Sequence, residues 1–297
     1  MAETTSTGTL LQGIGGFYTA LDDGGRVHTL RAQGKLRRER LKPKVGDRVE
    51  LTPGEGEAHG WICRILPRRN ELVRPPVANI DVIVIVVAAV TPDADLMMAD
   101  RLMLNARRAG ISVQLVINKC DLAPAIADDI ALQYRGAEVS PLKVCAATGE
   151  GLDALRTRLR GKVHALAGQS GAGKSTTINA LYGLALETGD LSRKIERGKN
   201  TTRQCQLIPV EGGGMVLDTP GFSLLESELF DPVELKDGWP EFAPFEGQCY
   251  FQPCYHATEP RCAVLQAVAE GRIDARRHGR YKVLLEELKL RWRDRYD

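Results

Sequence analysis

The chain of 297 residues has no long apolar run and no strong excess of charge of one sign. Its most apolar stretch, VIVIVVAAV at 82–90, is too short to cross a bilayer and is typical of a buried strand. The opening MAETTSTGTLLQ lacks the basic start and apolar run of a signal peptide, so we expect a cytoplasmic protein with no membrane partner. A net charge of +2 is too small to indicate nucleic acid by itself, so local charge has to carry that argument.

The seven cysteines are an odd number, which argues against a disulfide framework and favours thiols or metal ligands. Three of them and a histidine have the spacing C-x4-C-x-H-x5-C, formed by Cys249, Cys254, His256 and Cys262. Three thiolates and one imidazole make the closed tetrahedral shell of a structural zinc site, with no open position for a catalytic water. Unliganded thiols in a small core are the alternative.

Composition and spacing divide the chain into three predicted domains, 1–72, 73–228 and 229–297. The first has short extended runs between glycine turns, which predicts a small all-β barrel. The second alternates apolar strands with helical segments, as in a doubly wound α/β sheet whose ligand loops follow the carboxyl ends of the strands. The third contains the cysteine cluster and amphipathic segments, which predicts a metal-binding, mostly α domain.

A strongly basic run, GKLRRERLKPK at 34–44, lies between two predicted strands of the first domain. One interpretation is a solvated loop. The other is a contact with a nucleic-acid phosphate backbone, made by Lys35, Arg37, Arg38 and Arg40.

The stretch GQSGAGKSTT at 168–177 fits the phosphate-binding pattern G-x-x-x-x-G-K-S between a predicted strand and a predicted helix. Lys174 would reach the β- and γ-phosphates, and the Ser175 hydroxyl would ligate Mg²⁺. Backbone N–H groups at the start of the helix would face the phosphate oxygens. The nucleotide-binding residues predicted here are Gly168, Gln169, Ser170, Gly171, Ala172, Gly173, Lys174, Ser175 and Thr176, with a chance match as the alternative.

A second stretch, VLDTPGFS at 216–223, supplies groups for the metal and the γ-phosphate. Asp218 ends an apolar strand and could hold Mg²⁺ through a water, while Gly221 lets its N–H approach the γ-phosphate. The polar run at 196–204 lies where a mobile switch is needed, and Thr201 or Thr202 could add a hydroxyl to Mg²⁺. An ordinary surface loop is the alternative. Lys174, Thr201, Thr202 and Gly221 are our candidate catalytic residues, and Ser175 and Thr201 our candidate magnesium ligands.

A third stretch, VINKCDL at 116–122, is typical of a guanine-reading loop. The Asp121 carboxylate can accept hydrogen bonds from N1–H and the exocyclic amine of guanine, and adenine offers neither donor. The stem of Lys119 can lie along the base, and Asn118 can brace the neighbouring loops. A helix-capping role for Asp121 is the alternative. CAATGEGL at 145–152 would close over the base, with the N–H of Ala146 near the guanine oxygen.

The base-reading stretch precedes the phosphate-binding stretch, which reverses the order of an ordinary GTPase. A doubly wound sheet gathers its loops at one edge, so a site depends on where the loops lie in space rather than on their order. The reversal therefore indicates a circular permutation. It also means that the chain leaves the Asp218–Gly221 switch and soon enters the cysteine-rich segment.

These motifs together resemble the ribosome small-subunit-dependent GTPase A (RsgA) family over nearly the whole chain. The matching stretches are GKLR, VGDRVE, RRNELVRPPVANID, NKCDL, GQSGAGKST, DTPGF and CYHATEPRCAV. The resemblance implies an OB-fold barrel, a circularly permuted GTPase domain and a zinc domain. It also implies a protein that binds GTP and GDP, contacts the 16S rRNA of the small (30S) ribosomal subunit, and acts in late maturation of that subunit. We expect the protein to be a monomer.

The chain departs from the family pattern at two places. Asn200 stands where the family usually has a histidine before the switch threonines, and Cys145 and Ala147 replace a serine and a lysine in the guanine-closing loop. The resemblance implies GTP hydrolysis that is stimulated by the small subunit and acts as a release switch. The competing hypothesis is a GTP-sensing rRNA-binding module with negligible turnover.

Overall fold

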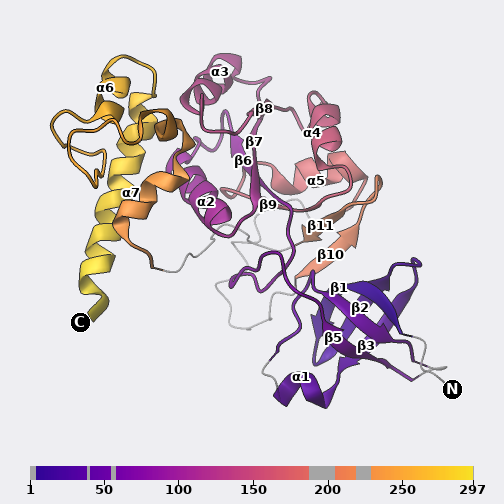
Figure 1. Cartoon of the computed structure of the whole chain (residues 1–297). Helices are drawn as coiled ribbons and strands as arrows, with labels where there is room; N and C mark the ends of the chain where they lie inside the picture. The colour runs from indigo at the N-terminus through magenta and orange to yellow at the C-terminus, as the bar shows by residue number, and fades with distance from the viewer. Residues whose placement is uncertain (1–4, 39–40, 55–57, 187–204, 219–228, 297) are drawn as a thin grey trace, which may run out of the picture.

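The structure is a computed structural model that describes residues 5–38, 41–54, 58–186, 205–218 and 229–296. Figure 1 shows three units in a row: an N-terminal barrel, a central α/β unit and a C-terminal helical unit. This order agrees with the predicted arrangement. The predicted limits at 72/73 and 228/229 stay a prediction.

Five strands close into the N-terminal barrel, in the cyclic order β1-β2-β3-β5-β4-β1. The β3–β5 pair is parallel and the other pairs are antiparallel. The inner face carries Leu10, Leu30 and Ile62, which are fully buried. The strands are β1 (Ser6–Ile14), β2 (Phe17–Asp22), β3 (Val27–Ala32), β4 (Arg48–Thr52) and β5 (Gly60–Ile65). The predicted all-β barrel is confirmed.

Two local features of the barrel differ from the sequence-based prediction. The extended runs predicted from the sequence are GGFYTAL, RVHTLRA, GDRVELT and GWICRILP, and they leave out strand β1. Its polar residues and Gly8 hide the strand pattern around Leu10. The basic run opens with a short helix, α1 (Gly34–Arg38), rather than a loop. The reason is Leu36, which is 1% exposed and belongs to the barrel core, so this stretch covers the barrel as well as presenting charge.

The central unit is a sheet whose parallel strands have the order β11-β9-β6-β7-β8. These are β6 (Val82–Ala88), β7 (Ser112–Asn118), β8 (Leu142–Lys143), β9 (Val163–Ala167) and β11 (Met215–Asp218), with β10 (Gln206–Pro209) antiparallel to β11. The helices are α2 (Leu96–Arg108), α3 (Pro124–Gln133), α4 (Leu152–Leu159) and α5 (Lys174–Tyr182). Every residue of β6 is buried, and its alternate side chains belong to two separate cores. The doubly wound prediction is confirmed. Its predicted helices are DADLMMADRLMLNARRAG, GLDALRTRL and the one after the glycine-rich loop, so α3 is an additional helix.

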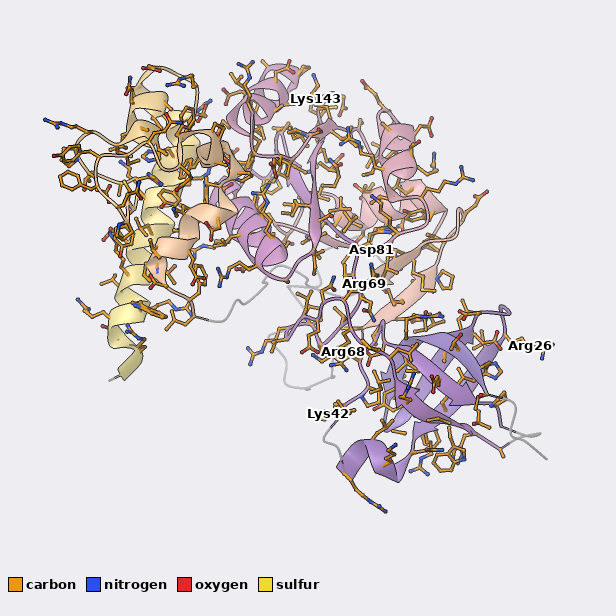
Figure 2. All side chains as sticks on the ribbon, viewed as in Figure 1. Arg26, Lys42, Arg68, Arg69, Asp81 and Lys143 are labelled. Atoms are coloured by element: carbon orange, nitrogen blue, oxygen red, sulfur yellow. The ribbon has the colours of Figure 1, made fainter. Side chains whose placement is uncertain are left out.

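Two consecutive arginines fix the barrel to the sheet (Figure 2). Arg68 donates through Nε to Oδ1 of the fully buried Asp47 in the barrel, at 2.7 Å. Arg69 pairs with Asp81 at 2.5 Å, just before β6, and the other oxygen of Asp81 accepts from the N–H of Val163. Strands β1 and β10 also pair, at Gln12 and Gln206. The barrel is therefore attached to the central sheet both by side-chain ion pairs and by backbone pairing between strands.

The C-terminal unit packs on α2 through η2 (Pro232–Gly238), and its helix α7 (Ala275–Arg293) is joined to α2 by ion pairs such as Arg277–Asp100. Its other elements are η3 (Pro240–Phe245), α6 (Ala263–Ala269) and η4 (Asp294–Tyr296). Trp239, Phe242 and Tyr281 form the centre of its core. Among the residues that the structure describes, no helix is long and apolar enough to span a bilayer.

Candidate nucleotide site and metal centre

Asn118, at the carboxyl end of β7, joins the two loops on either side of it. Its Nδ2 donates to the carbonyl oxygen of Ala172 in the phosphate-binding loop at 2.9 Å. Its Oδ1 accepts from the N–H of Ala146, in the loop after β8, at 3.1 Å. Asn118 is 2% exposed, so these bonds are shielded from water. Asn118 thus braces its neighbouring loops as expected, and it joins the base-reading stretch to the phosphate-binding loop and to the loop at 145–152.

Lys119 strengthens the same junction from the other side. Its Nζ donates to the carbonyl oxygen of Gly171 at 3.0 Å and to that of Thr91, in the loop after β6. The backbone of Lys119 has a positive φ of 59°, which turns the chain sharply after β7. The loop after β6 was not part of the predicted site, and its position at the carboxyl edge of a central strand was the signal that could have indicated it.

The phosphate-binding loop is packed too closely for side chains at two of its glycines. A Cβ on Gly168 would lie 2.2 Å from the carbonyl oxygen of Val86, and one on Gly173 would lie 2.2 Å from Nδ2 of Asn118. Both glycines also have positive φ values, 129° and 94°. Helix α5 begins directly after Gly173, so its free N–H groups open toward this loop.

Lys174 folds back over the loop, where its Nζ donates to the carbonyl oxygens of Gly168 and Gln169, both at 2.8 Å. Burial lowers the pKa of this ammonium group. Two backbone carbonyls are weak partners for a buried cation, and a phosphate anion would replace them favourably. The side chain is therefore placed for an anionic ligand.

Asp218 ends β11, which lies next to β9, the strand that leads into the phosphate-binding loop. Burial raises the pKa of this carboxyl group, because no cation compensates its charge among the described residues. Ser175 is half-buried in the first turn of α5. A carboxylate at the end of β11 and a hydroxyl in the first turn of α5 are oxygen donors of the kind that Mg²⁺ requires, and a bound cation would reverse the pKa shift of Asp218.

Asp121 is exposed at the start of the loop before α3. The N-cap of α3 is Ala123, without a side-chain cap, so the helix-capping alternative for Asp121 is wrong. The N–H of Ala146 donates to Asn118, so a contact between this N–H and guanine would have to share or replace that bond. The guanine contacts of Asp121, Lys119 and Ala146 stay predictions.

The candidate residues Thr201, Thr202 and Gly221 lie outside the described residues, as does Asn200, so their roles stay predictions. Of the basic run, Lys35 and Arg38 are exposed on α1. The side chain of Arg37 and the whole of Arg40 lie outside the described part. The nucleic-acid contact of this run therefore also stays a prediction.

Cys249, Cys254, His256 and Cys262 are all buried, and their ligand atoms lie within 4.8 Å of one another. Nδ1 of His256 is 3.3 Å from Sγ of Cys262 and 3.6 Å from Sγ of Cys249, and these two sulfurs are 3.7 Å apart. A tetrahedral zinc ion with ordinary bond lengths would give about 3.5 Å for N–S edges and about 3.8 Å for S–S edges. The cluster therefore fits a metal ion.

The groups around this cluster also suit a metal. Nε2 of His256 lies 2.8 Å from Oε1 of Glu246, an arrangement that holds Nδ1 toward the metal position. Backbone N–H groups of Ala263 and Leu265 donate to the sulfurs of Cys249 and Cys262. Burial raises the pKa of Cys254 to about 12, and a metal cation would supply the charge that stabilises its thiolate. Glu246 was missed because no fixed spacing marks such a supporting residue.

The fold and the loops together define a circularly permuted P-loop GTPase joined to a barrel and a metal-binding unit. Residues 7–62 match the sequence profile of the RsgA N-terminal domain, and residues 65–228 match that of the RsgA GTPase. A small ribosomal subunit biogenesis GTPase RsgA from Agathobacter rectalis is 39% identical over 298 residues, which cover 96% of this chain and 99% of that protein. The chain belongs to the RsgA GTPase family.

Two solved structures support the same conclusion. The crystal structure of YjeQ from Thermotoga maritima has a TM-score of 0.83 and 33% identity, covering 96% of this chain and 99% of that one. The structure of YloQ, described as a circularly permuted GTPase, has a TM-score of 0.80 and 29% identity, covering 97% and 96%. The permutation expected from the reversed motifs is thereby confirmed.

Proposed function

We propose that this protein is a GTPase that acts in late maturation of the small ribosomal subunit and contacts its 16S rRNA. The observation that carries the GTPase part is the position of Asn118, which joins the phosphate-binding loop to the loop after β8. The ribosomal part is supported by the relative named as a small ribosomal subunit biogenesis GTPase, which matches almost end to end.

The phosphates would bind at the start of α5. The N–H groups of the loop would donate to phosphate oxygens, and Nζ of Lys174 would leave the carbonyls of Gly168 and Gln169 to reach the β- and γ-phosphates. Mg²⁺, held by Ser175 and, through water, by Asp218, would neutralise charge that develops on the phosphates. Thr201 or Thr202 would complete its coordination, and the N–H of Gly221 would contact the γ-phosphate.

The base would lie between the loops after β7 and β8. The carboxylate of Asp121 would accept from N1–H and the exocyclic amine of guanine, which gives selectivity against adenine. The zinc ion proposed at Cys249, Cys254, His256 and Cys262 would be structural, because four protein ligands leave no position for a substrate.

Intrinsic hydrolysis should be slow. Many GTPases place a glutamine after the D-x-x-G glycine to orient the attacking water, and this chain has Phe222 there. Asn200 is neutral and a poor general base. We expect the ribosomal particle to order residues 198–203 and so to accelerate turnover, after which GDP-bound protein would leave the particle.

The test is single-turnover GTP hydrolysis with and without purified small subunits. Marked acceleration by small subunits, but not by large subunits, would support the proposal. Tight GTP binding with negligible turnover under both conditions would instead support a GTP-sensing rRNA-binding module. Fast hydrolysis by the isolated protein, unchanged by subunits, would overturn the proposed stimulation.

A further inference from the structure

A cavity at the joint between the barrel and the central sheet is used by neither the nucleotide site nor the metal site. Its volume is about 450 Å³, which is within the range of cavities that hold small molecules. Figure 2 shows Arg69 and Asp81 of its wall side by side between the barrel and the sheet. We call it the joint cavity, and its polar side chains are those of Arg69, Asn70, Asp81, Ser112 and Lys162.

The joint cavity lies at the opposite edge of the sheet from the nucleotide loops. Ser112 is the first residue of β7, and Lys162 directly precedes β9, whereas the nucleotide loops follow the carboxyl ends of these strands. Strand β7 has seven residues, so the two edges are about 20 Å apart. A ligand in the joint cavity would therefore not compete for the space that GTP needs.

The side-chain acceptors on the wall of the cavity are already engaged. Oδ1 of Asp81 lies 2.5 Å from Nη1 of Arg69, and Oδ2 accepts from the N–H of Val163 at 2.8 Å. Oδ1 of Asn70 accepts from the N–H of Ile80 at 3.0 Å, and Nδ2 of Asn70 donates to the carbonyl oxygen of Ile80 at 2.9 Å. A cationic ligand would therefore find its carboxylate already paired with an arginine.

The donors on the same wall are largely unused. The ammonium group of Lys162 is exposed and forms no ion pair or hydrogen bond with any described residue. The guanidinium of Arg69 donates to Asp81 and to the carbonyl oxygen of Asn79, which leaves further N–H groups of its five. The exposed hydroxyl of Ser112 likewise has no partner in the part of the chain that the structure describes. Free donors without free acceptors are the chemistry of an anion site.

We propose that the joint cavity binds the phosphate group of a small phosphorylated molecule, with Lys162, Arg69 and Ser112 as the donors. A phosphate monoester carries nearly two negative charges and three strong acceptor oxygens, so it can offer an oxygen to each of these groups. A carboxylate has one charge and only two oxygens. The cavity is larger than a phosphate group needs, so its remaining volume suits the organic part of the molecule. This site goes beyond the proposed GTPase function and does not depend on it.

Such a ligand would strengthen the joint between the barrel and the sheet. Arg69 belongs to the segment after β5, and Lys162 to the loop between α4 and β9. An anion bound to both would add a second bridge beside the ion pair of Arg69 with Asp81. A ligand that binds only the folded state stabilises that state, so occupancy should raise the midpoint of thermal unfolding.

The test uses the full-length, metal-containing protein with excess GDP and Mg²⁺, which occupy the phosphate-binding loop. The probe is methyl phosphate, titrated calorimetrically at constant ionic strength and about pH 7.5, where a monoester is mostly a dianion. We expect saturable binding. Lys162→Gln should weaken it by about tenfold, because a hydrogen bond to a charged group is lost. Lys162→Arg, which keeps the charge and the donors, should retain most of the affinity.

Lys282→Gln is the matched control, because Lys282 is an exposed lysine of α7, far along the chain from the cavity. It should bind methyl phosphate like the unsubstituted chain. Two further probes distinguish the sources of an anion. Dimethyl phosphate, a diester, represents an RNA backbone, and acetate represents an acidic peptide. Both should bind much more weakly than methyl phosphate, since each carries a single charge.

Equal affinity of Lys162→Gln and the unsubstituted chain for methyl phosphate would place the anion elsewhere and overturn the proposal. Absence of saturable binding would overturn it as well. Dimethyl phosphate that binds as tightly as methyl phosphate would indicate an RNA backbone, and acetate that does so would indicate an acidic peptide. Either result would overturn the assignment to a small phosphorylated molecule. Thermal unfolding of each variant without ligand confirms that the substitutions leave the fold intact.

Discussion

Nδ2 of Asn118 donates a 2.9 Å hydrogen bond to the carbonyl oxygen of Ala172, which lies 54 positions further along the chain. This bond explains how the reversed order of the motifs still gives one site. The two loops follow β7 and β9, parallel strands on either side of β6, and so emerge at the same edge of the sheet. Cutting and rejoining the chain elsewhere leaves this neighbourhood intact.

Asn118→Ala should weaken GTP and GDP binding by about tenfold, since two buried groups, the carbonyl of Ala172 and the N–H of Ala146, lose their partner. Equilibrium binding of labelled GDP would measure this. The matched control is Asn70→Ala, which removes a similar two-bond bridge to the backbone of Ile80, away from the nucleotide loops. Equal affinities of the two variants for GDP would contradict the role given to Asn118.

Asp121→Ala should abolish the preference for guanine over adenine nucleotides, because it removes the acceptor of two hydrogen bonds from the base. Competition between GDP and ADP for the purified variant measures the preference directly. Asp128→Ala, at an exposed carboxylate of α3 that pairs with Lys143 on β8, serves as the control. A variant at Asp121 that kept full selectivity would remove the guanine-reading role from this loop.

Carefully reduced protein should contain about one zinc ion per chain, and Cys254→Ala should lose it and unfold mainly the C-terminal unit. Elemental analysis gives the metal content, and limited proteolysis reports which unit opens. Cys63→Ala, at a half-buried thiol of the barrel, should keep the metal. Reduced protein without zinc would show that the four residues form an unliganded cluster.

Arg277→Met should destabilise the docking of α7 by about 3–5 kcal/mol, because it leaves the buried carboxylate of Glu241 without its ion-pair partner and Asp100 with Arg280 alone. Arg277 is 1% exposed and pairs with Asp100 on α2 and with Glu241 on η3, at 2.5 Å from the latter.

The adjacent Arg276 is exposed, and Arg276→Ala breaks its pairs with Asp129 and with Asp274, each of which should cost about 0–1 kcal/mol. Urea unfolding measures the loss of stability in each variant. Similar unfolding midpoints for Arg277→Met and Arg276→Ala would contradict the predicted difference between the buried and the exposed arginine.

Acidification should destabilise the strand that leads into the phosphate-binding loop. Burial lowers the pKa of His164 on β9, so below its ordinary value of 6.5 the unfolded chain binds this proton more readily than the folded chain. The free energy of unfolding therefore falls as the pH falls through that range. His164→Gln removes this titration while leaving the other histidines in place.

The check is urea unfolding of both proteins at about pH 7.5 and about pH 5.5, on either side of the ordinary histidine pKa. The stability advantage of the unsubstituted chain over His164→Gln should shrink at the lower pH. An advantage that stays constant, or grows, would show that His164 takes up its proton in the folded state as easily as in the unfolded one.

The sequence alone determined the class of site, because phosphate binding, base reading and metal binding need particular residue types at close spacing. Gly168–Ser175, Asn118–Asp121 and the cluster around Cys254 are such local patterns. The continuous apolar run of β6 likewise predicted a strand that is buried on both faces. Elements with a weak hydrophobic periodicity cannot be recognised in this way, and β1 and α3 are two such elements.

Only the tertiary structure decided which distant residues support these patterns. Glu246 pairs with His256, and the carbonyl oxygen of Thr91 accepts a hydrogen bond from Lys119. Arg277 pairs with Asp100, which lies 177 positions away in the chain. The spacing of residues in the sequence predicts none of these contacts. The same holds for Arg69 and Lys162, which line one cavity only because the barrel joins the sheet beside the amino end of β9. Strand pairing and helix packing set these distances, and the interactions that fix them are spread over the whole chain.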